Sequence, residues 1–140
     1  MLVQEWMNPR PLTLAPEATM AQAKALMEQY WIRHLLVVEG DALVGILSDR
    51  DVRTASLPPG AQNPAAAREA HLARVAVREA MTRDPRTVRP DAPLVDVARL
   101  MIEHRFSGVP VVDGARLVGI LTETDILRAF ITMAEGQRPA

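Results

Sequence analysis

Apolar positions follow two different periods along this chain, and both periods appear in each half. In the second half, residues 94–104 carry apolar side chains three and four positions apart, which is the spacing of one helix face. In the first half, Thr19 is followed three residues later by Gln22, a pairing that typically begins a helix and predicts one over residues 19–30. The predicted apolar face in the second half consists of Leu94, Val97, Ala98 and Met101.

Short continuous apolar runs predict the strands. Residues 35–38 and 43–47 are two such runs, and a short segment with one glycine separates them. In the second half the separating segment contains Asp113-Gly114, a dipeptide typical of tight hairpins. A shorter extended piece, residues 12–14, precedes the first helix. We therefore expect one extended segment and one antiparallel hairpin in each half.

The order of these elements returns after 74 residues. A shift of 74 positions aligns residues 7–51 with residues 81–125 without a gap. Within this alignment the run LVGIL is identical at residues 43–47 and 117–121. An ungapped match of this length indicates two copies of one supersecondary unit, neither of which buries the face of its sheet alone.

The predicted fold class is α+β, with two β-α-β-β-α units in a pseudo-two-fold arrangement. We place the first unit at residues 2–56 and the second at residues 76–133. Residues 57–75 are expected to form a linker made of a loop and a helix, because Pro and Gly cluster at its start. Residues 134–140 are expected to form a flexible tail.

Gly45 and Gly119 occupy the same position in the repeated run. One explanation is that they are ordinary strand glycines. The other is that each marks a point where another backbone segment comes close. Both explanations stay open at the level of sequence.

Composition limits the classes of partner. The net charge is −1 and 49% of the 140 residues are apolar, so a folded core is expected, and a basic surface for nucleic acid or anionic lipid is not. No apolar run reaches the length of a membrane span, and the N-terminus lacks a basic segment followed by an apolar one. Cysteine is absent, which excludes disulfides and thiolate chemistry. A cytoplasmic location is therefore expected.

No motif for catalysis or for metal binding stands out. The sequence has no Walker A loop, no G-x-G-x-x-G and no Ser-His-Asp pattern. His71 and His104 lack partners at metal-ligand spacing. Asp49 and Asp51 are too few for a hard-cation site on their own, although Mg²⁺ bound to a nucleotide can recruit them. We therefore expect a protein that is not an enzyme and holds no metal by itself.

Ser48 and Asp51 form an S-x-x-D motif, and Thr122 and Asp125 form its counterpart in the second copy. One interpretation is a helix cap, in which the hydroxyl accepts a backbone N–H and the acid reaches back to the first residue. The other is a binding site, because a helix N-terminus suits phosphate and a carboxylate one turn later accepts both hydroxyls of a ribose. A carboxylate bound to ribose cannot serve fully as a cap, so the two interpretations predict different effects of substitution.

These features together resemble a known family. The order Met-x₃-Pro-x-Thr, a helix, IRHLLVV or FSGVPVVD, and then G-I-L-[ST]-x-x-D is similar to the cystathionine-beta-synthase (CBS) domain, of which a tandem pair is called a Bateman module. The resemblance covers residues 2–132 and recurs in both copies. Residues 32–56 further resemble the stand-alone CBS proteins linked to acetoin utilisation.

The resemblance implies a regulatory module that binds an adenosine-containing ligand in clefts between the two units. AMP, ADP, ATP and S-adenosylmethionine are the expected ligands, and Mg²⁺ can accompany a nucleotide. The resemblance also implies a homodimer assembled through helices and a target protein that responds to the ligand. One alternative is a ligand-free structural, dimerisation or partner-binding module, and another is a hydrolase that uses the paired acids.

In the first copy, the resemblance places Asp51 on the ribose and Ser48 beside the phosphate. Arg33 and His34, just before the second strand, would reach the phosphates, although an exposed pair at a helix–strand junction needs no such role. Thr13 would lie near the base, or is simply a strand-forming residue. The predicted ligand-binding residues of this copy are Thr13, Arg33, His34, Leu35, Ser48 and Asp51.

In the second copy, Ser107 and Gly108 replace the basic pair and resemble the small residues that let an adenosine lie against the strand. The two sites are therefore expected to differ in charge. Pro110 matches the family's proline before the Val-Val pair, whereas the first copy has Leu36 there, which changes the expected shape of the first site. The predicted ligand-binding residues of this copy are Thr87, Ser107, Gly108, Val109, Pro110, Thr122 and Asp125.

Overall fold

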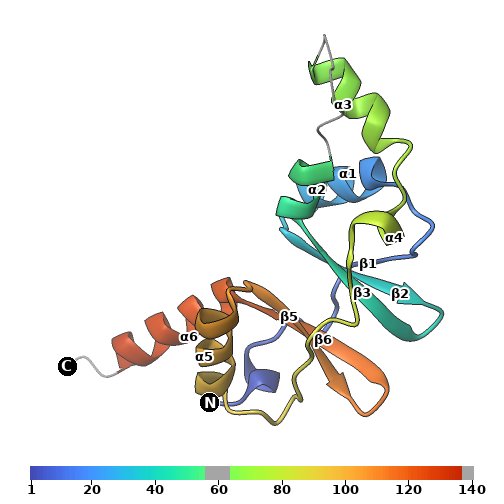
Figure 1. The fold of residues 1–140 in the computed structure, drawn as a ribbon. Helices are drawn as coiled ribbons and strands as arrows, with labels where there is room; N and C mark the ends of the chain where they lie inside the picture. The colour runs from blue at the N-terminus through green and yellow to red at the C-terminus, as the bar shows by residue number, and fades with distance from the viewer. Residues whose placement is uncertain (56–63, 137–140) are drawn as a thin grey trace. The chain divides into compact units, whose positions relative to one another are not determined.

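The computed structural model describes residues 1–55 and 64–136 (Figure 1). The chain divides into two compact units. We call Leu12–Pro85 the first-repeat unit, and Met1–Pro11 together with Arg86–Ala140 the second-repeat unit. The loop expected at the start of the linker and residues 137–140 lie outside the described residues.

The first-repeat unit is built on a four-stranded sheet. Its strands lie in the order β1-β2-β3-β4, with β1 parallel to β2 and the other neighbours antiparallel. The strands are β1 (Thr13–Leu14), β2 (His34–Glu39), β3 (Ala42–Ser48) and β4 (Thr82–Arg83). The helices are α1 (Met20–Tyr30), α2 (Asp49–Ala55), α3 (Pro64–Leu72) and α4 (Val77–Ala80).

The second-repeat unit repeats this plan around one antiparallel hairpin, with two helices beside it (Figure 1). The hairpin is formed by β5 (Gly108–Asp113) and β6 (Arg116–Thr122). Its helices are η1 (Val3–Glu5), α5 (Leu94–His104) and α6 (Glu123–Gly136). The predicted α+β class is confirmed, and the predicted order of elements forms in the first copy, whereas in the second copy a single bridge at Val88 stands in place of the first strand. α6 ends at Gly136, so residues 134–136 are helical, although the sequence placed them in a flexible tail.

Each unit completes its sheet with the segment that begins the other repeat. In the second-repeat unit, Asn8 pairs with Ile120 on β6 through two backbone hydrogen bonds of 2.9 and 3.0 Å. In the first-repeat unit, β4 pairs with β3 in the same way. Residues 1–11 thus belong to the unit of the second repeat and residues 76–85 to that of the first. The repeat boundaries in the sequence do not reveal this exchange.

Proline explains why the two sheets differ in extent. In the first-repeat unit, the N–H of Leu36 donates to the carbonyl of Leu12 at 3.3 Å and supports a strand pair. The equivalent residue in the second-repeat unit is Pro110, which has no N–H to donate. There the parallel contact is reduced to one bridge, between Val88 and Val111. At the other edge of the first sheet, Thr82 and Arg83 of β4 both pair with β3. The second-repeat unit has Pro9 in the place of Arg83, and its contact is the single bridge between Asn8 and Ile120.

The local signals read from the sequence form as expected. The N–H of Thr19 donates to Gln22 Oε1 at 2.9 Å, and the N–H of Gln22 donates to Thr19 Oγ1 at 3.1 Å, so the predicted capping box begins α1. Gly40 and Gly114 each adopt a φ of 62° in the hairpin turns, a conformation that glycine takes without strain.

Each unit has its own hydrophobic core. On α5 the predicted face is buried at Leu94, Val97 and Met101, because its period matches the helix and turns one stripe towards the hairpin. The core of the second-repeat unit includes Val3, Val109, Val111 and Leu121. The core of the first-repeat unit includes Met20, Ala23, Leu35, Val37, Leu47, Leu72 and Val77.

Candidate functional site

The candidate site in each unit lies where the hairpin passes into a helix. Ser48 is the last residue of β3 and Asp51 lies in the first turn of α2. Thr122 and Asp125 occupy the same places between β6 and α6. The strand fixes the hydroxyl and the helix fixes the carboxylate, so both groups are held by regular backbone.

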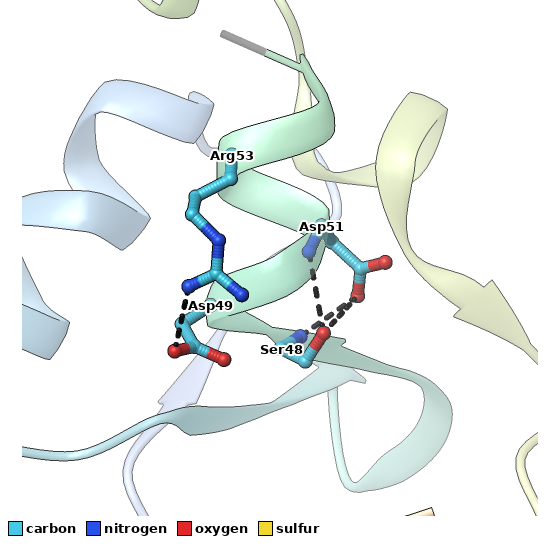
Figure 2. Close-up of polar contacts among 4 residues, drawn as sticks. All are labelled: Ser48, Asp49, Asp51 and Arg53. Carbon is cyan, nitrogen blue, oxygen red and sulfur yellow. Dashed lines mark hydrogen bonds and ion pairs between the residues drawn. The ribbon is translucent and has the colours of Figure 1, made fainter. Parts of the chain in front are cut away.

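In the first-repeat unit the motif closes on itself as a helix cap (Figure 2). The backbone N–H and the Oγ hydroxyl of Ser48 both donate to Asp51 Oδ2, at 2.8 and 3.0 Å. The N–H of Asp51 donates back to Ser48 Oγ at 3.3 Å. The cap interpretation therefore describes this motif.

The second-repeat unit forms two of these three contacts with threonine. The N–H and the Oγ1 hydroxyl of Thr122 donate to Asp125 Oδ2 at 2.8 and 3.1 Å. Asp125 is 8% exposed and is the only buried charged residue in the described part of the chain. Two hydrogen bonds from Thr122 offset part of the cost of burying this charge.

The cap uses one oxygen of each carboxylate, Oδ2, and the surroundings of the other oxygen, Oδ1, differ between the two repeats. For Asp51, Oδ1 has no hydrogen bond or ion pair among residues 1–55 and 64–136. Figure 2 shows this oxygen pointing away from Ser48 and from Arg53, which pairs with Asp49 at 3.0 Å instead. For Asp125, Oδ1 lies 3.6 Å from Arg128 Nη1. The cap contacts therefore engage one oxygen of each carboxylate, Oδ2, whereas the expectation from sequence treated the carboxylate as a whole.

The strand register brings other candidate residues to the same end of each hairpin. His34 lies opposite Ser48, and the carbonyl of Arg33 accepts the N–H of Asp49 at 2.9 Å. In the second-repeat unit, Gly108 lies opposite Thr122, and Ser107 accepts the N–H of Glu123 at 2.9 Å. The structure thus groups the basic pair with Ser48, and the small pair with Thr122.

The remaining candidates divide by burial. Thr13 and Thr87 are exposed at the start of their extended segments. Leu35 is fully buried, Val109 is 1% exposed, and both side chains belong to the hydrophobic cores. Pro110 is buried as well. These three residues have backbone atoms, rather than side chains, to offer a ligand.

Arg128 is the residue of the site that the sequence analysis did not select. Its spacing of three residues from Asp125 was the available signal, because positions three apart lie on one helix face. No group of three or more His, Asp or Glu side chains that could hold a metal ion occurs in the described residues. None of the helices within residues 1–55 and 64–136 is long and apolar enough to cross a bilayer.

Comparison with known families identifies the repeated unit. The family model of the CBS domain matches residues 3–58 and again residues 77–132. The chain is a pair of CBS domains. The predicted resemblance is therefore confirmed over both copies, and the S-x-x-D and T-x-x-D motifs lie within the two matched segments.

Curated relatives fall into two groups by length. The CBS domain-containing protein YhcV of Bacillus subtilis is 31% identical over 126 residues, which cover 89% of this CBS pair and 81% of YhcV. The L-aspartate semialdehyde sulfurtransferase of Methanocaldococcus jannaschii is 34% identical, but the match covers only 23% of that enzyme. In the second kind of relative, a CBS pair is one part of a longer enzyme.

Solved structures share the fold over nearly the whole chain. The CBS domain pair of protein MJ0100, in complex with 5′-methylthioadenosine and S-adenosyl-L-methionine, matches with a TM-score of 0.79 and 31% identity over 95% of this chain and 98% of that one. A putative acetoin utilization protein (AcuB) from Vibrio cholerae matches with a TM-score of 0.78 and 32% identity over 99% and 98%. CBSX2 in complex with AMP matches with a TM-score of 0.78 and 29% identity over 95% and 98%.

Proposed function

We propose that this CBS pair is a regulatory module that binds AMP, ADP, ATP or S-adenosylmethionine at the S/T-x-x-D end of its repeats. The observation that carries the proposal is the Asp51 carboxylate, which Ser48 holds in place through Oδ2 while Oδ1 stays without a partner among the described residues. Solved CBS pairs of the same fold are complexes with AMP and with S-adenosyl-L-methionine, which supports the choice of ligand class.

The chemistry of the site suits a ribose beside a phosphate. An ionised carboxylate only accepts hydrogen bonds and has room for several, so Asp51 can keep its cap and still accept from ribose hydroxyls. Arg33 and His34, at the same end of the hairpin, supply donors for phosphate oxygens, and Arg does so through a planar fork. The second repeat has Ser107 and Gly108 there, so this end of its hairpin lacks the basic pair.

The proposed output is a change of packing rather than a chemical reaction. A ligand shifts the population of two arrangements only if it binds one of them more tightly. We propose that a target protein in the cytoplasm reads this shift, and that Mg²⁺ enters only with a bound nucleotide. The alternative is a module that binds no ligand and acts through a partner protein alone.

We further propose that the module is a homodimer joined through α5 and α6. These helices expose large apolar side chains, each more than half accessible. At the equivalent positions of the first-repeat unit, Glu28 and Arg53 are charged, so that face does not complement an apolar one. A second molecule of the chain therefore contributes the same apolar face, as in a self-complementary two-fold dimer. The exposed apolar residues are Val95, Ile102, Leu127, Phe130 and Ile131.

Thermal unfolding with each of the four ligands tests the binding proposal. A ligand at 100 times its dissociation constant adds about 2.7 kcal/mol, which raises the melting temperature by roughly 5–10 °C for a chain of this size. Asp51→Asn keeps one oxygen for the cap and removes the second anionic acceptor, so it should remove the part of the rise that comes from the first repeat, with a smaller loss of intrinsic stability than Asp51→Ala. No rise with any ligand would favour the partner-binding alternative, and release of a hydrolysis product would show an enzyme.

A further inference from the structure

The two carboxylates of the repeated motif differ at their second oxygen. Asp125 Oδ1 lies 3.6 Å from the guanidinium Nη1 of Arg128. Asp51 Oδ1 has no ion pair or hydrogen bond within the described residues. The other oxygen of each carboxylate, Oδ2, is held in the same way in both repeats. It accepts from the N–H and the hydroxyl of the Ser or Thr three residues earlier. The repeats therefore present one open and one occupied acceptor.

The position of a single arginine produces this difference. Arg128 follows Asp125 by three residues, and residues three apart lie on one side of a helix. The equivalent of Arg128 in the first repeat is Thr54. Arg53, two residues after Asp51, pairs with Asp49 at 3.0 Å instead (Figure 2).

We infer that Arg128 sets the order in which the two repeats take up ligand: it occupies the second oxygen of Asp125, so ribose binds first at Asp51. This inference rests on the proposed function and names a regulator of that site. A ribose at Asp125 must displace or share the guanidinium, whereas a ribose at Asp51 meets a carboxylate oxygen that no described residue engages.

The expected size of the effect follows from the exposure of the two groups. The side chain of Arg128 is 70% exposed and that of Asp125 is 11% exposed, so the arginine can swing into solvent. An exposed pair of this kind changes an equilibrium constant by a factor of about two to five. Arg128 therefore weakens the second site without closing it.

A ligand without phosphate isolates this effect. Arg128 competes for the carboxylate that ribose needs, but its charge also attracts a phosphate. With AMP the two contributions oppose each other. 5′-Methylthioadenosine has the ribose and no phosphate, so only the competition remains.

The test measures the affinity for 5′-methylthioadenosine by titration calorimetry in the Asp51→Asn background, where Asp125 is the intact site. Adding Arg128→Thr, which copies the first repeat, should tighten binding by about two- to fivefold. Arg99→Thr is the matched control, because Arg99 is also 70% exposed and lies 3.9 Å from an aspartate three residues away, Asp96. The control should leave the affinity unchanged.

The converse exchange tests the first repeat. In the Asp125→Asn background, Thr54→Arg places an arginine three residues after Asp51 and should weaken binding by a similar factor. Unchanged or weaker binding in the Arg128→Thr variant, or no binding at Asp125 even without Arg128, would overturn the inference while wild-type binding upholds the proposed function. A wild-type chain that binds none of the adenosine ligands would refute both, and circular dichroism confirms that each variant is folded.

Discussion

The carbonyl oxygen of Asn8 lies 2.7 Å from the place where a β-carbon on Gly119 would stand. The two residues meet because Asn8 pairs with Ile120 on β6, next to the glycine. In the first-repeat unit, the carbonyl of Thr82 and the side chain of Met81 approach Gly45 in the same way. Of the two explanations that the sequence left open, close approach of another backbone segment is therefore the one observed in both units.

Gly119→Ala should destabilise the protein by about 1–3 kcal/mol, because a backbone carbonyl cannot move aside without breaking its sheet contact. Gly45→Ala should cost less, since the nearest atom there is the sulfur of the flexible Met81 side chain, 2.5 Å away. Urea denaturation of both variants measures the difference. Gly136→Ala is the control and should be close to neutral, because a β-carbon added there would meet nothing within 4 Å. Equal loss in all three variants would contradict the close-approach explanation.

Two helices end on a residue in the left-handed conformation that is not glycine. Trp31 after α1 has a φ of 55° and Arg105 after α5 a φ of 57°. Because glycine adopts this conformation without a steric penalty, Arg105→Gly and Trp31→Gly should each raise the free energy of unfolding, by about 0.5–1 kcal/mol. Trp31 is 94% exposed, so little packing is lost with its ring.

Gly114→Ala is the control for these two variants, because it adds a side chain at a left-handed position instead of removing one. Gly114 has a φ of 62° and open space around its α-carbon, so only backbone strain changes. It should destabilise by about 1 kcal/mol. A loss of stability on Arg105→Gly would show that its side chain makes contacts that outweigh the strain.

Asp51→Ala and Asp51→Asn should separate the cap from the ligand site. The alanine variant loses the acceptor for both Ser48 donors and should lose about 0.5–2 kcal/mol of stability. The asparagine variant keeps an oxygen for the cap and should lose less, while both variants lose the ligand-induced stabilisation that the first repeat contributes. Denaturant unfolding with and without AMP measures both quantities. AMP stabilisation in Asp51→Ala equal to that of the wild type would show that AMP does not bind at Asp51.

Single cysteines can test the proposed dimer, because the chain contains none. Ile102 is 79% exposed on the apolar face, so Ile102→Cys should be joined to its copy by a short bismaleimide. Glu28→Cys, at the equivalent position of the first-repeat unit, should stay uncross-linked. Phe130→Asp should shift sedimentation towards the monomer. Cross-links formed only when the Ile102→Cys and Glu28→Cys chains are mixed would show that unlike faces meet.

The pKa of Lys24, on α1, is raised above its usual 10.5, mainly by its hydrogen bond to Glu69 on α3. A raised lysine pKa contributes stability that is present below 10.5 and is lost as the pH rises through the higher value of the folded state. Both side chains are more than a third exposed, so the contribution should stay below about 1 kcal/mol. Comparing Lys24→Met with Lys24→Arg across this pH range measures it, because Arg stays charged. An identical alkaline response in both variants would contradict it.

Much of the fold followed from local signals in the sequence. The capping box at Thr19, the helix face on residues 94–104 and the two hairpins depend on residues close together along the chain. Periodicity and capping chemistry act over such short ranges, so they can be read without knowing the tertiary structure. The ungapped alignment at a shift of 74 residues then showed that the chain contains two copies of one structural unit.

The candidate site was partly visible in the same way. The repeat and the family resemblance predicted each S/T-x-x-D motif and the two residues at the start of the preceding strand. The strand register brings His34 beside Ser48, and Gly108 beside Thr122. The use of only one carboxylate oxygen by the cap could not be read, because it depends on side-chain geometry. The pairing of Arg128 with Asp125 depends on a rotamer as well as on spacing.

Which segment completes which sheet depends on the tertiary structure. Asn8 is far from Ile120 along the chain, and a hydrogen bond between them follows from the exchange of segments between repeats. The repeated helices and hairpins could be predicted from sequence alone, because short windows of the chain encode them. Tertiary structure determined the sheet edges and the role of Gly45 and Gly119, because backbone groups at an edge pair with whatever strand the whole fold brings to them.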